Sequence, residues 1–237
     1  MDIQRIYKSK SKRQSKKIQF KYIDKKTKLV IRDPKIIERL KSLKIPPNYK
    51  RVVISRSSRN KIQAIGVDSK NRKQYIYNPK FIEKQKTIKF HDLILFGKFI
   101  KKIRVDINKI IRDTASGVEP LLSKKSLIAL ILFLVDNCHF RVGCEKYKLL
   151  YKTYGVTTLN KSHFKILNNA IKIEFIGKKG VLNKSRVGRH DVCKILQELC
   201  VKNTGNYLFY SKEENNNNSK SKKIRITEKH VNNYLKK

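Results

Sequence analysis

Acidic residues are scarce in this chain of 237 residues. The sequence has 18 aspartates and glutamates against 58 lysines and arginines, which leaves a formal net charge of 58 − 18 = +40. So many positive charges repel one another unless a polyanion binds and neutralises them, so nucleic acid is the favoured ligand. The few carboxylates form no cluster of the kind that holds Mg²⁺, and no Walker-type phosphate loop is present. Nucleotide bias also explains part of the lysine and asparagine excess, as in the run Asn215 to Asn218, so charge alone does not name the ligand.

Long apolar runs are also missing. A membrane-spanning helix needs roughly 18 apolar residues, and the nine from Leu127 to Val135 are too few. We therefore predict a buried helix at this run and exclude a membrane protein. The N-terminus has no apolar signal-peptide core, so we expect an intracellular protein, in a cell or a virus particle, where thiols remain reduced.

Cysteine is used four times, at Cys138, Cys144, Cys193 and Cys200. We expect free thiols buried in the core. A zinc site could be drawn from the first three together with His139 and His190, but no spacing matches a C-x-x-C knuckle. The sequence therefore predicts no metal site.

Cap and turn residues predict an α+β protein of two domains. Residues 1–20 carry many cations opposed only by Asp2, which predicts a solvated basic arm. Residues 21–79 predict a small β-sheet domain. Alternation over 19–32 indicates a hairpin, Asp33 and Pro34 begin a helix that Pro46 ends, and strands follow at 51–55 and on both sides of a polar turn within 61–78.

Residues 80–237 predict a mainly helical domain that contains a three-stranded sheet. Ser123 caps the helix that carries the apolar run and delivers Arg141 at its end. The three strands are expected at 163–167, 171–177 and 181–186, and a helix at 190–202. Thr227 caps a final helix, in which Tyr234 lies on the apolar stripe.

One predicted strand carries a cation beside two tyrosines. The two-residue period of a strand puts Lys73, Tyr75 and Tyr77 on one face. Such a face offers phosphate contacts together with ring contacts to sugars or base edges. The rings could equally cover the core of a half-buried sheet, and the residues alone leave both interpretations open.

Two cations stand in a pattern suited to phosphoryl transfer. The chain runs Arg141-Val142-Gly143-Cys144-Glu145-Lys146-Tyr147, and later Phe175-Ile176-Gly177-Lys178. A guanidinium fork meets two non-bridging phosphate oxygens with fixed geometry. A lysine at a hairpin tip beside a glycine can protonate a departing alkoxide. Most arginines and lysines are simply solvated surface charges, which is the competing interpretation.

These segments resemble the type IB DNA topoisomerases of the small poxvirus and bacterial kind. The resemblance also rests on Thr153 to His163 and on I-Q-A-x-G-x-D-x-K-x-R-x-Q-Y-x-Y, which begins at Ile62 and has Asn71 where the family usually has glycine. It covers almost everything from about Leu40 onward. A tyrosine recombinase shares the catalytic fold but would not bring this amino-terminal motif.

The resemblance implies roles for particular residues. Arg141 would bind the scissile phosphate, and Lys178, rather than its neighbour Lys179, would protonate the leaving 5′ oxygen. Tyr147 would contact a base, and Cys144 stands where some relatives have a base-reading lysine. The amino-terminal domain would contact double-stranded DNA through Lys70, Arg72, Lys73, Gln74, Tyr75 and Tyr77. The family needs no cofactor, because a phosphotyrosine stores the bond energy.

The resemblance leaves three of the family's five catalytic positions unmatched: the second arginine, the histidine and the nucleophilic tyrosine. His230 and Tyr234 are not accepted as replacements, since Tyr234 matches a packing residue. We expect an amino-terminal fragment of a type IB topoisomerase that binds DNA but does not cleave it alone. A separate polypeptide could carry the missing segment. The alternative is a non-catalytic DNA-binding protein derived from the family.

Overall fold

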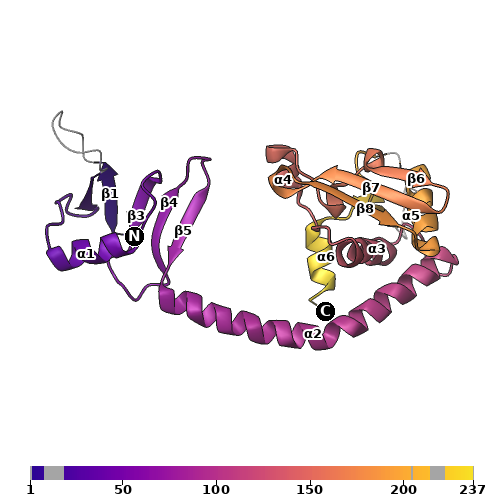
Figure 1. Cartoon of the computed structure of the whole chain (residues 1–237), viewed down its shortest axis with the longest axis horizontal. Coiled ribbons are helices and arrows are strands. Elements are labelled where there is room, and N and C mark those ends of the chain that lie inside the picture. Colours follow the sequence, from indigo (N-terminus) through magenta and orange to yellow (C-terminus); the bar gives the residue numbers. More distant parts are fainter. Residues whose placement is uncertain (1, 8–18, 204, 214–221, 237) are drawn as a thin grey trace. The chain divides into compact units, whose positions relative to one another are not determined.

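The computed structural model describes residues 2–7, 19–203, 205–213 and 222–236. The basic stretch from Lys8 to Lys17 and the asparagine run lie outside these ranges. The chain separates into two compact units, Met1–Phe96 and Gly97–Lys237, and contains both sheets and helices (Figure 1). The predicted α+β class is confirmed.

Unit 1 is built on a five-stranded antiparallel sheet whose strands lie in the order β2-β1-β3-β4-β5. The strands are β1 Ile3–Tyr7, β2 Phe20–Asp24, β3 Lys50–Ile54, β4 Ile62–Val67 and β5 Lys73–Tyr77. Helix α1, Pro34–Ser42, begins as predicted, because the Asp33 carboxylate accepts hydrogen bonds from the first free backbone N–H groups. Its Leu40 packs into the core with Ile3 and Ile54.

The prediction of a solvated arm over residues 1–20 was wrong for its first part. Ile3–Tyr7 pairs with both β2 and β3, and Ile3 is fully buried. Arg5 is only 7% exposed, because its guanidinium donates to the backbone oxygens of Ile45, Pro46 and Tyr49 at 2.9–3.0 Å. A charged side chain can be buried when every donor it turns inward finds an acceptor.

The predicted hairpin over 19–32 forms only in part. Beyond the turn after Asp24, Val30 makes a single bridge to Ile23, and the partner of β2 is β1. The predicted strands at 51–55 and 61–78 are confirmed as β3, β4 and β5.

Helix α2, Pro79–Ala115, runs for 37 residues and leads from unit 1 into unit 2. The sequence placed the domain boundary at Pro79, whereas the division into compact units falls inside this helix. Among the described residues, no helix is both long and apolar enough to cross a membrane.

Unit 2 surrounds helix α3, Lys124–Asn137, whose residues from Ser126 to Leu134 are all buried. The predicted buried helix is therefore confirmed. A three-stranded sheet, order β6-β7-β8, packs one face against this core (Figure 1). Its strands are β6 Phe164–Leu167, β7 Ala170–Ile176 and β8 Leu182–Val187. The other elements are α4 Glu145–Tyr151, α5 His190–Lys202, β9 Tyr210–Glu213, β10 Lys222–Arg225, α6 Glu228–Tyr234 and the short 3₁₀ turns Val156–Thr158, Lys161–His163 and Lys178–Gly180.

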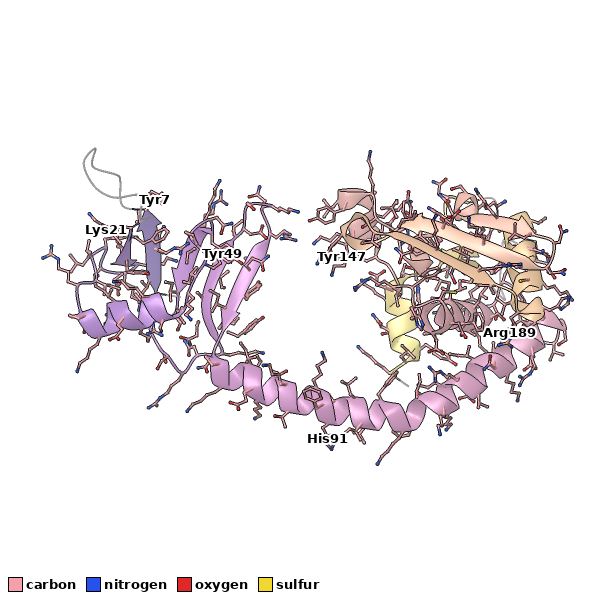
Figure 2. The ribbon with its side chains drawn as sticks, viewed as in Figure 1. Tyr7, Lys21, Tyr49, His91, Tyr147 and Arg189 are labelled. Atoms are coloured by element: carbon pink, nitrogen blue, oxygen red, sulfur yellow. The ribbon has the colours of Figure 1, made fainter. Side chains whose placement is uncertain are left out.

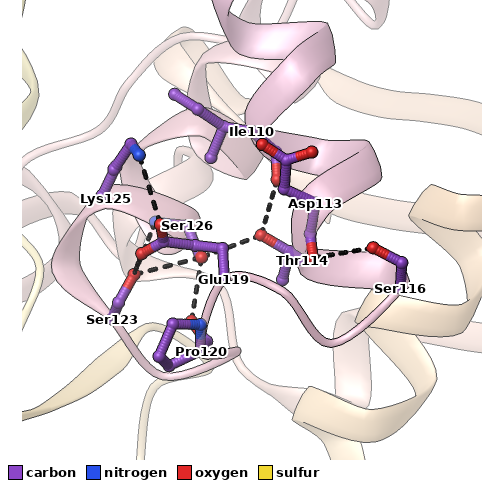
Figure 3. A network of polar contacts seen from close by, with 9 residues as sticks. All are labelled: Ile110, Asp113, Thr114, Ser116, Glu119, Pro120, Ser123, Lys125 and Ser126. Atoms are coloured by element: carbon purple, nitrogen blue, oxygen red, sulfur yellow. Dashed lines mark hydrogen bonds and ion pairs between the residues drawn. The ribbon is translucent and has the colours of Figure 1, made fainter.

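A polar network fixes the start of α3 against the end of α2 (Figure 3). The Ser123 hydroxyl caps α3 by accepting from the Ser126 N–H at 3.0 Å, and it donates to Glu119 at 2.8 Å. The hydroxyls of Ser126 and Thr114 lie 2.8 Å apart, and Thr114 also donates to the Ile110 carbonyl. Because each buried hydroxyl has a partner, the two helices join without an unsatisfied polar group at this corner.

The four cysteines are free, as predicted, but only Cys193 is buried. Its thiol donates to the Val187 carbonyl at 3.2 Å, and burial raises its pKa. Cys138, Cys144 and Cys200 are half-buried, and Cys138 and Cys200 pack against the core, so the predicted burial of these three thiols was correct only in part. Within the described part of the chain, His, Cys, Asp and Glu side chains form no group that could hold a metal ion.

Candidate nucleic-acid interface and phosphate site

The β4–β5 turn in unit 1 is organised by Asp68. Its carboxylate accepts from the side chains of Arg72 and Gln74 at 2.8 and 2.9 Å, and from the backbone N–H groups of Lys70 and Arg72 at 2.9 Å. The hydrogen bonds from Arg72 are the main cause that holds the pKa of Asp68 well below its usual range. Asn71 adopts a left-handed φ of 57° within this turn, which asparagine tolerates better than most residues.

Two of the predicted DNA contacts therefore have a second function that the sequence did not reveal. Arg72 and Gln74 hold the turn together through Asp68. Lys70 and Lys73 are exposed beside them. Asp68 belongs to the motif that begins at Ile62, and its position four residues before Arg72 could have indicated an ion pair between them.

Tyr75 and Tyr77 form a stacked pair on one face of β5, with ring centroids 6.2 Å apart. Tyr77 also contacts Phe81 at 5.7 Å, and Tyr75 is 43% exposed. Ile76, on the opposite face of the strand, packs against the core of unit 1. The rings therefore do not form that core, which weakens the interpretation in which they merely cover it.

Arg141 lies in the loop between α3 and α4 and not at the helix end, which corrects the prediction. The helix ends at Asn137, and His139 turns the chain with a left-handed φ of 55°. The Arg141 carbonyl accepts from the Val156 N–H at 2.9 Å. This bond fixes the backbone of Arg141, while the residue as a whole is exposed.

Two glycines allow that pairing. A Cβ on Gly155 would lie 2.5 Å from the Cα of Gly143, closer than real Cβ atoms approach. Gly143 also has a φ of +91°, a conformation that favours glycine. The glycine of the Arg-x-Gly motif is therefore required by the close contact of two backbone segments.

Lys178 is exposed at the turn between β7 and β8, as predicted. The backbone closes this turn through Gly177 N–H to Val181 O at 2.7 Å. Lys179, the rival cation, takes a left-handed φ of 65°.

The segments that carry Arg141 and Lys178 are neighbours. Val156 bonds to Arg141, and Tyr154, two residues earlier, donates to the Ile176 carbonyl at 2.8 Å. The rings of Phe140 and Phe175 also meet edge to face, 4.8 Å apart. The structure thus brings both predicted catalytic cations onto adjoining backbone.

Tyr147 projects from α4 (Figure 2). Its side chain is 57% exposed, and its ring stacks on that of Tyr151 with the centroids 6.1 Å apart. Helix α4 is anchored by Glu145, which accepts from the Tyr207 hydroxyl at 2.7 Å and pairs with Arg225 at 2.8 Å. The Tyr207 bond is the main cause that lowers the pKa of Glu145. This anchor was not predicted, because it joins residues far apart in the sequence.

Tyr234 is partly buried and packs against the core of unit 2, which confirms its predicted packing position. Burial raises the pKa of its phenol. His230 belongs to the start of α6, where its Nδ1 accepts from the Thr227 N–H at 3.0 Å.

Comparison with known proteins adds family information to this geometry. Residues 78–237 match the model of the eukaryotic DNA topoisomerase I catalytic core, and residues 19–68 match that of the bacterial DNA topoisomerase IB N-terminal domain. Residues 69–77, with the predicted contacts on β5, lie between the two matched stretches.

Two viral relatives match this chain over different lengths. DNA topoisomerase 1B of Acanthamoeba polyphaga mimivirus is 33% identical over 231 residues, which are 97% of this chain and 64% of that protein. DNA topoisomerase I of Monkeypox virus is 28% identical over 148 residues, 61% of this chain and 45% of that protein. The chain thus spans less than two thirds of the length of these relatives.

Proposed function

This chain belongs to the type IB DNA topoisomerase family, and on that premise we propose that it binds duplex DNA and contributes Arg141 and Lys178 to transient cleavage of one strand. The observation that carries the proposal is the hydrogen-bonded link from Arg141 through Val156 and Tyr154 to Ile176, which places the backbone segments that carry the two cations side by side. Their positions match those that the family uses for the scissile phosphate and the leaving oxygen.

The chemistry follows from the charges. The Arg141 guanidinium stabilises the negative charge that develops on the non-bridging oxygens as the phosphorus is attacked. The Lys178 ammonium gives its proton to the departing 5′ oxygen, which is otherwise a poor leaving group. Neither step uses ATP or a metal ion, and relaxation of supercoils follows from rotation of the freed end before the strand is resealed.

The DNA is held by two surfaces in this proposal. In unit 1 it is contacted by the exposed Lys70 and Lys73 and by the stacked pair Tyr75 and Tyr77, while Arg72 adds a contact without leaving Asp68. In unit 2, Tyr147 on α4 reaches a base. Because DNA is the proposed ligand, we expect the protein to act inside a cell or a virus particle.

We place the nucleophile outside these 237 residues, either in further residues of the same chain or in a separate polypeptide. Tyr234 is a poor candidate for the nucleophile, because its ring packs against the core of unit 2 and burial disfavours the phenolate that would attack phosphorus. The 237 residues alone would then bind DNA without cleaving it, which is also the behaviour of the alternative, a non-catalytic DNA-binding member of the family.

Binding is tested by titrating a fluorescent duplex at several salt concentrations. If about six phosphates are neutralised, log K should fall against log salt with a slope near −5, about 0.9 per contact. Replacing both Tyr75 and Tyr77 with Ala should weaken binding more than Tyr7→Ala, a control at another exposed ring of unit 1. Salt-insensitive binding, or equal effects of the two variants, contradicts the assignment of this interface.

Cleavage is tested with a nicked suicide duplex, followed by denaturation and a search for protein shifted by attached DNA. We expect no shifted band from the 237 residues. A band that disappears in Tyr234→Phe would overturn the packing assignment. Adding a polypeptide with the missing arginine, histidine and tyrosine should produce the band, and Lys178→Ala should then suppress it far more than Lys179→Ala. No band after this addition favours the non-catalytic alternative.

A further inference from the structure

The outer face of the three-stranded sheet in unit 2 carries like charges in direct register. Lys165 on β6 lies opposite Lys172 on β7, and Lys172 lies opposite Arg186 on β8. Directly opposed side chains on adjacent strands have Cβ atoms about 4.5–5.5 Å apart, so the three cations form one row across the sheet. We call these three residues the cation row.

The row is poorly neutralised by the protein. Glu174 is the acid on this face, and it pairs with Lys172 at 3.1 Å and with Lys184 at 3.4 Å. Among the described residues, neither Lys165 nor Arg186 has an ion-pair partner. Four cations and one carboxylate leave a local charge of 4 − 1 = +3.

Folding does not explain the row. The opposite face of the same strands supplies the core through Ile171, Ile173 and Phe175, whereas Lys165 and Arg186 are exposed. Like charges placed directly opposite one another destabilise a sheet. A row that costs stability and faces solvent is explained by an external anion that spans several positions.

We propose that the cation row binds the phosphate backbone of duplex DNA, beyond the segment held at Arg141 and Lys178. The inference rests on the proposed function, because it extends the surface that the DNA contacts. Six residues separate Lys172 from Lys178, roughly 20 Å of chain at about 3.3 Å per residue. Measured along the axis of a duplex, where one strand advances about 3.4 Å per nucleotide, this length corresponds to roughly six further base pairs.

The test compares a duplex of about 12 base pairs with one of about 36, with the salt slope measured on each. All three charges of the cation row are removed in one variant, Lys165→Gln/Lys172→Gln/Arg186→Gln. On the long duplex this variant should lose about 2.7 from the magnitude of the slope, 0.9 for each of three contacts. On the short duplex its slope should equal that of the parent.

Two controls accompany the measurement. Lys98→Gln/Lys101→Gln/Lys102→Gln on α2 removes the same charge from exposed positions elsewhere and should not produce the length-dependent loss. The variant Lys165→Gln/Arg186→Gln keeps both ion pairs of Glu174 and should lose about two contacts on the long duplex alone. The melting temperature of this double variant should be unchanged or higher than that of the parent, because repulsion is removed.

The outcomes separate the two proposals. If the parent fails to bind DNA in a salt-dependent way, the proposed function fails. If the parent binds but neutralising the row changes neither slope, only the cation-row inference is overturned, and an acidic protein becomes the better candidate for this face. An equal loss on both duplexes would place the row inside the main contact and overturn its separate position.

Discussion

The two units bury their cores by different means. Unit 2 has one large apolar cluster around α3, in which Leu127, Leu130 and Leu134 are completely buried. The apolar core of unit 1 is much smaller, and charged and polar side chains such as Arg5, Asp24 and Asp68 are buried beside it. The stability of unit 2 therefore depends mainly on packed volume, whereas that of unit 1 depends on hydrogen-bond geometry and on ionised groups.

This difference bears on function. Lys70, Arg72 and Gln74, three of the predicted DNA contacts of unit 1, are held by Asp68, so the polar groups that stabilise the unit are next to those that would meet DNA. In unit 2 the apolar core fixes the backbone around Arg141 and Lys178, and both side chains remain exposed. A substitution in the apolar core of unit 2, or in the buried polar contacts of unit 1, should leave the other unit folded. Hydrogen exchange measured on individual peptides can show which unit is destabilised.

The largest effect is expected for Leu130→Ala. The side chain is fully buried in α3, so its truncation should cost unit 2 about 2–5 kcal/mol through lost burial and the cavity that remains. Exchange should accelerate in peptides of unit 2 and stay unchanged in unit 1. Leu149→Ala is the matched control, since this residue is 73% exposed and should change the stability by less than about 0.5 kcal/mol.

A smaller loss, confined to unit 1, is expected for Arg5→Lys. The guanidinium donates to three carbonyl oxygens and lies over the Phe20 ring at 4.1 Å, and an ammonium cannot reproduce this planar arrangement. We expect a loss of about 1.5–3 kcal/mol, the range for hydrogen bonds to charged groups. Arg59→Lys, at an exposed position, is the control, and equal melting curves for both variants would contradict the importance of the buried guanidinium.

Asp68→Asn should lower the stability of unit 1 at neutral pH and flatten its dependence on acid, because the neutral amide loses the charge-assisted hydrogen bonds of the carboxylate, although its oxygen can still accept from the backbone of the turn. The folded pKa of Asp68 is depressed, so its contribution is present above the unfolded pKa of about 3.9 and is lost as the pH falls through the folded value. Thermal melts between neutral pH and pH 2 should show a steeper acid loss for the parent than for the variant. Asp92→Asn, on the exposed part of α2, should keep the slope of the parent.

The smallest effect is expected in unit 2 for Thr157→Val. The Thr157 hydroxyl is buried and has no hydrogen-bond partner within the described part of the chain, whereas its neighbour Thr158 bonds to Gly155. Replacing an unsatisfied hydroxyl by a methyl group of similar shape should leave the stability unchanged or raise it slightly. Thr158→Val should lower it, and a lower melting temperature for Thr157→Val than for Thr158→Val would contradict this account.

Local chemistry in the sequence was enough to predict much of the secondary structure. Asp33 and Ser123 cap helices with their own side chains, and the apolar run after Ser123 forms a helix that is buried on all sides. The strands β4, β5, β6, β7 and β8 also follow from alternation and turns. The motifs around Arg141 and Lys178 indicated the family, because the spacing of motif residues along the chain can be read directly.

The tertiary structure decided the features that join distant residues. Arg5 was predicted to be solvated, yet its acceptors lie some 40 residues away and are invisible to a local pattern. The same holds for Glu145 with Tyr207 and Arg225, and for Tyr154 with Ile176, the bond that joins the segments carrying the two catalytic candidates. A sequence specifies which residues carry charge and chemistry, but the pairing of backbone segments decides which of these charges are buried, which hold a turn and which remain available to a phosphate.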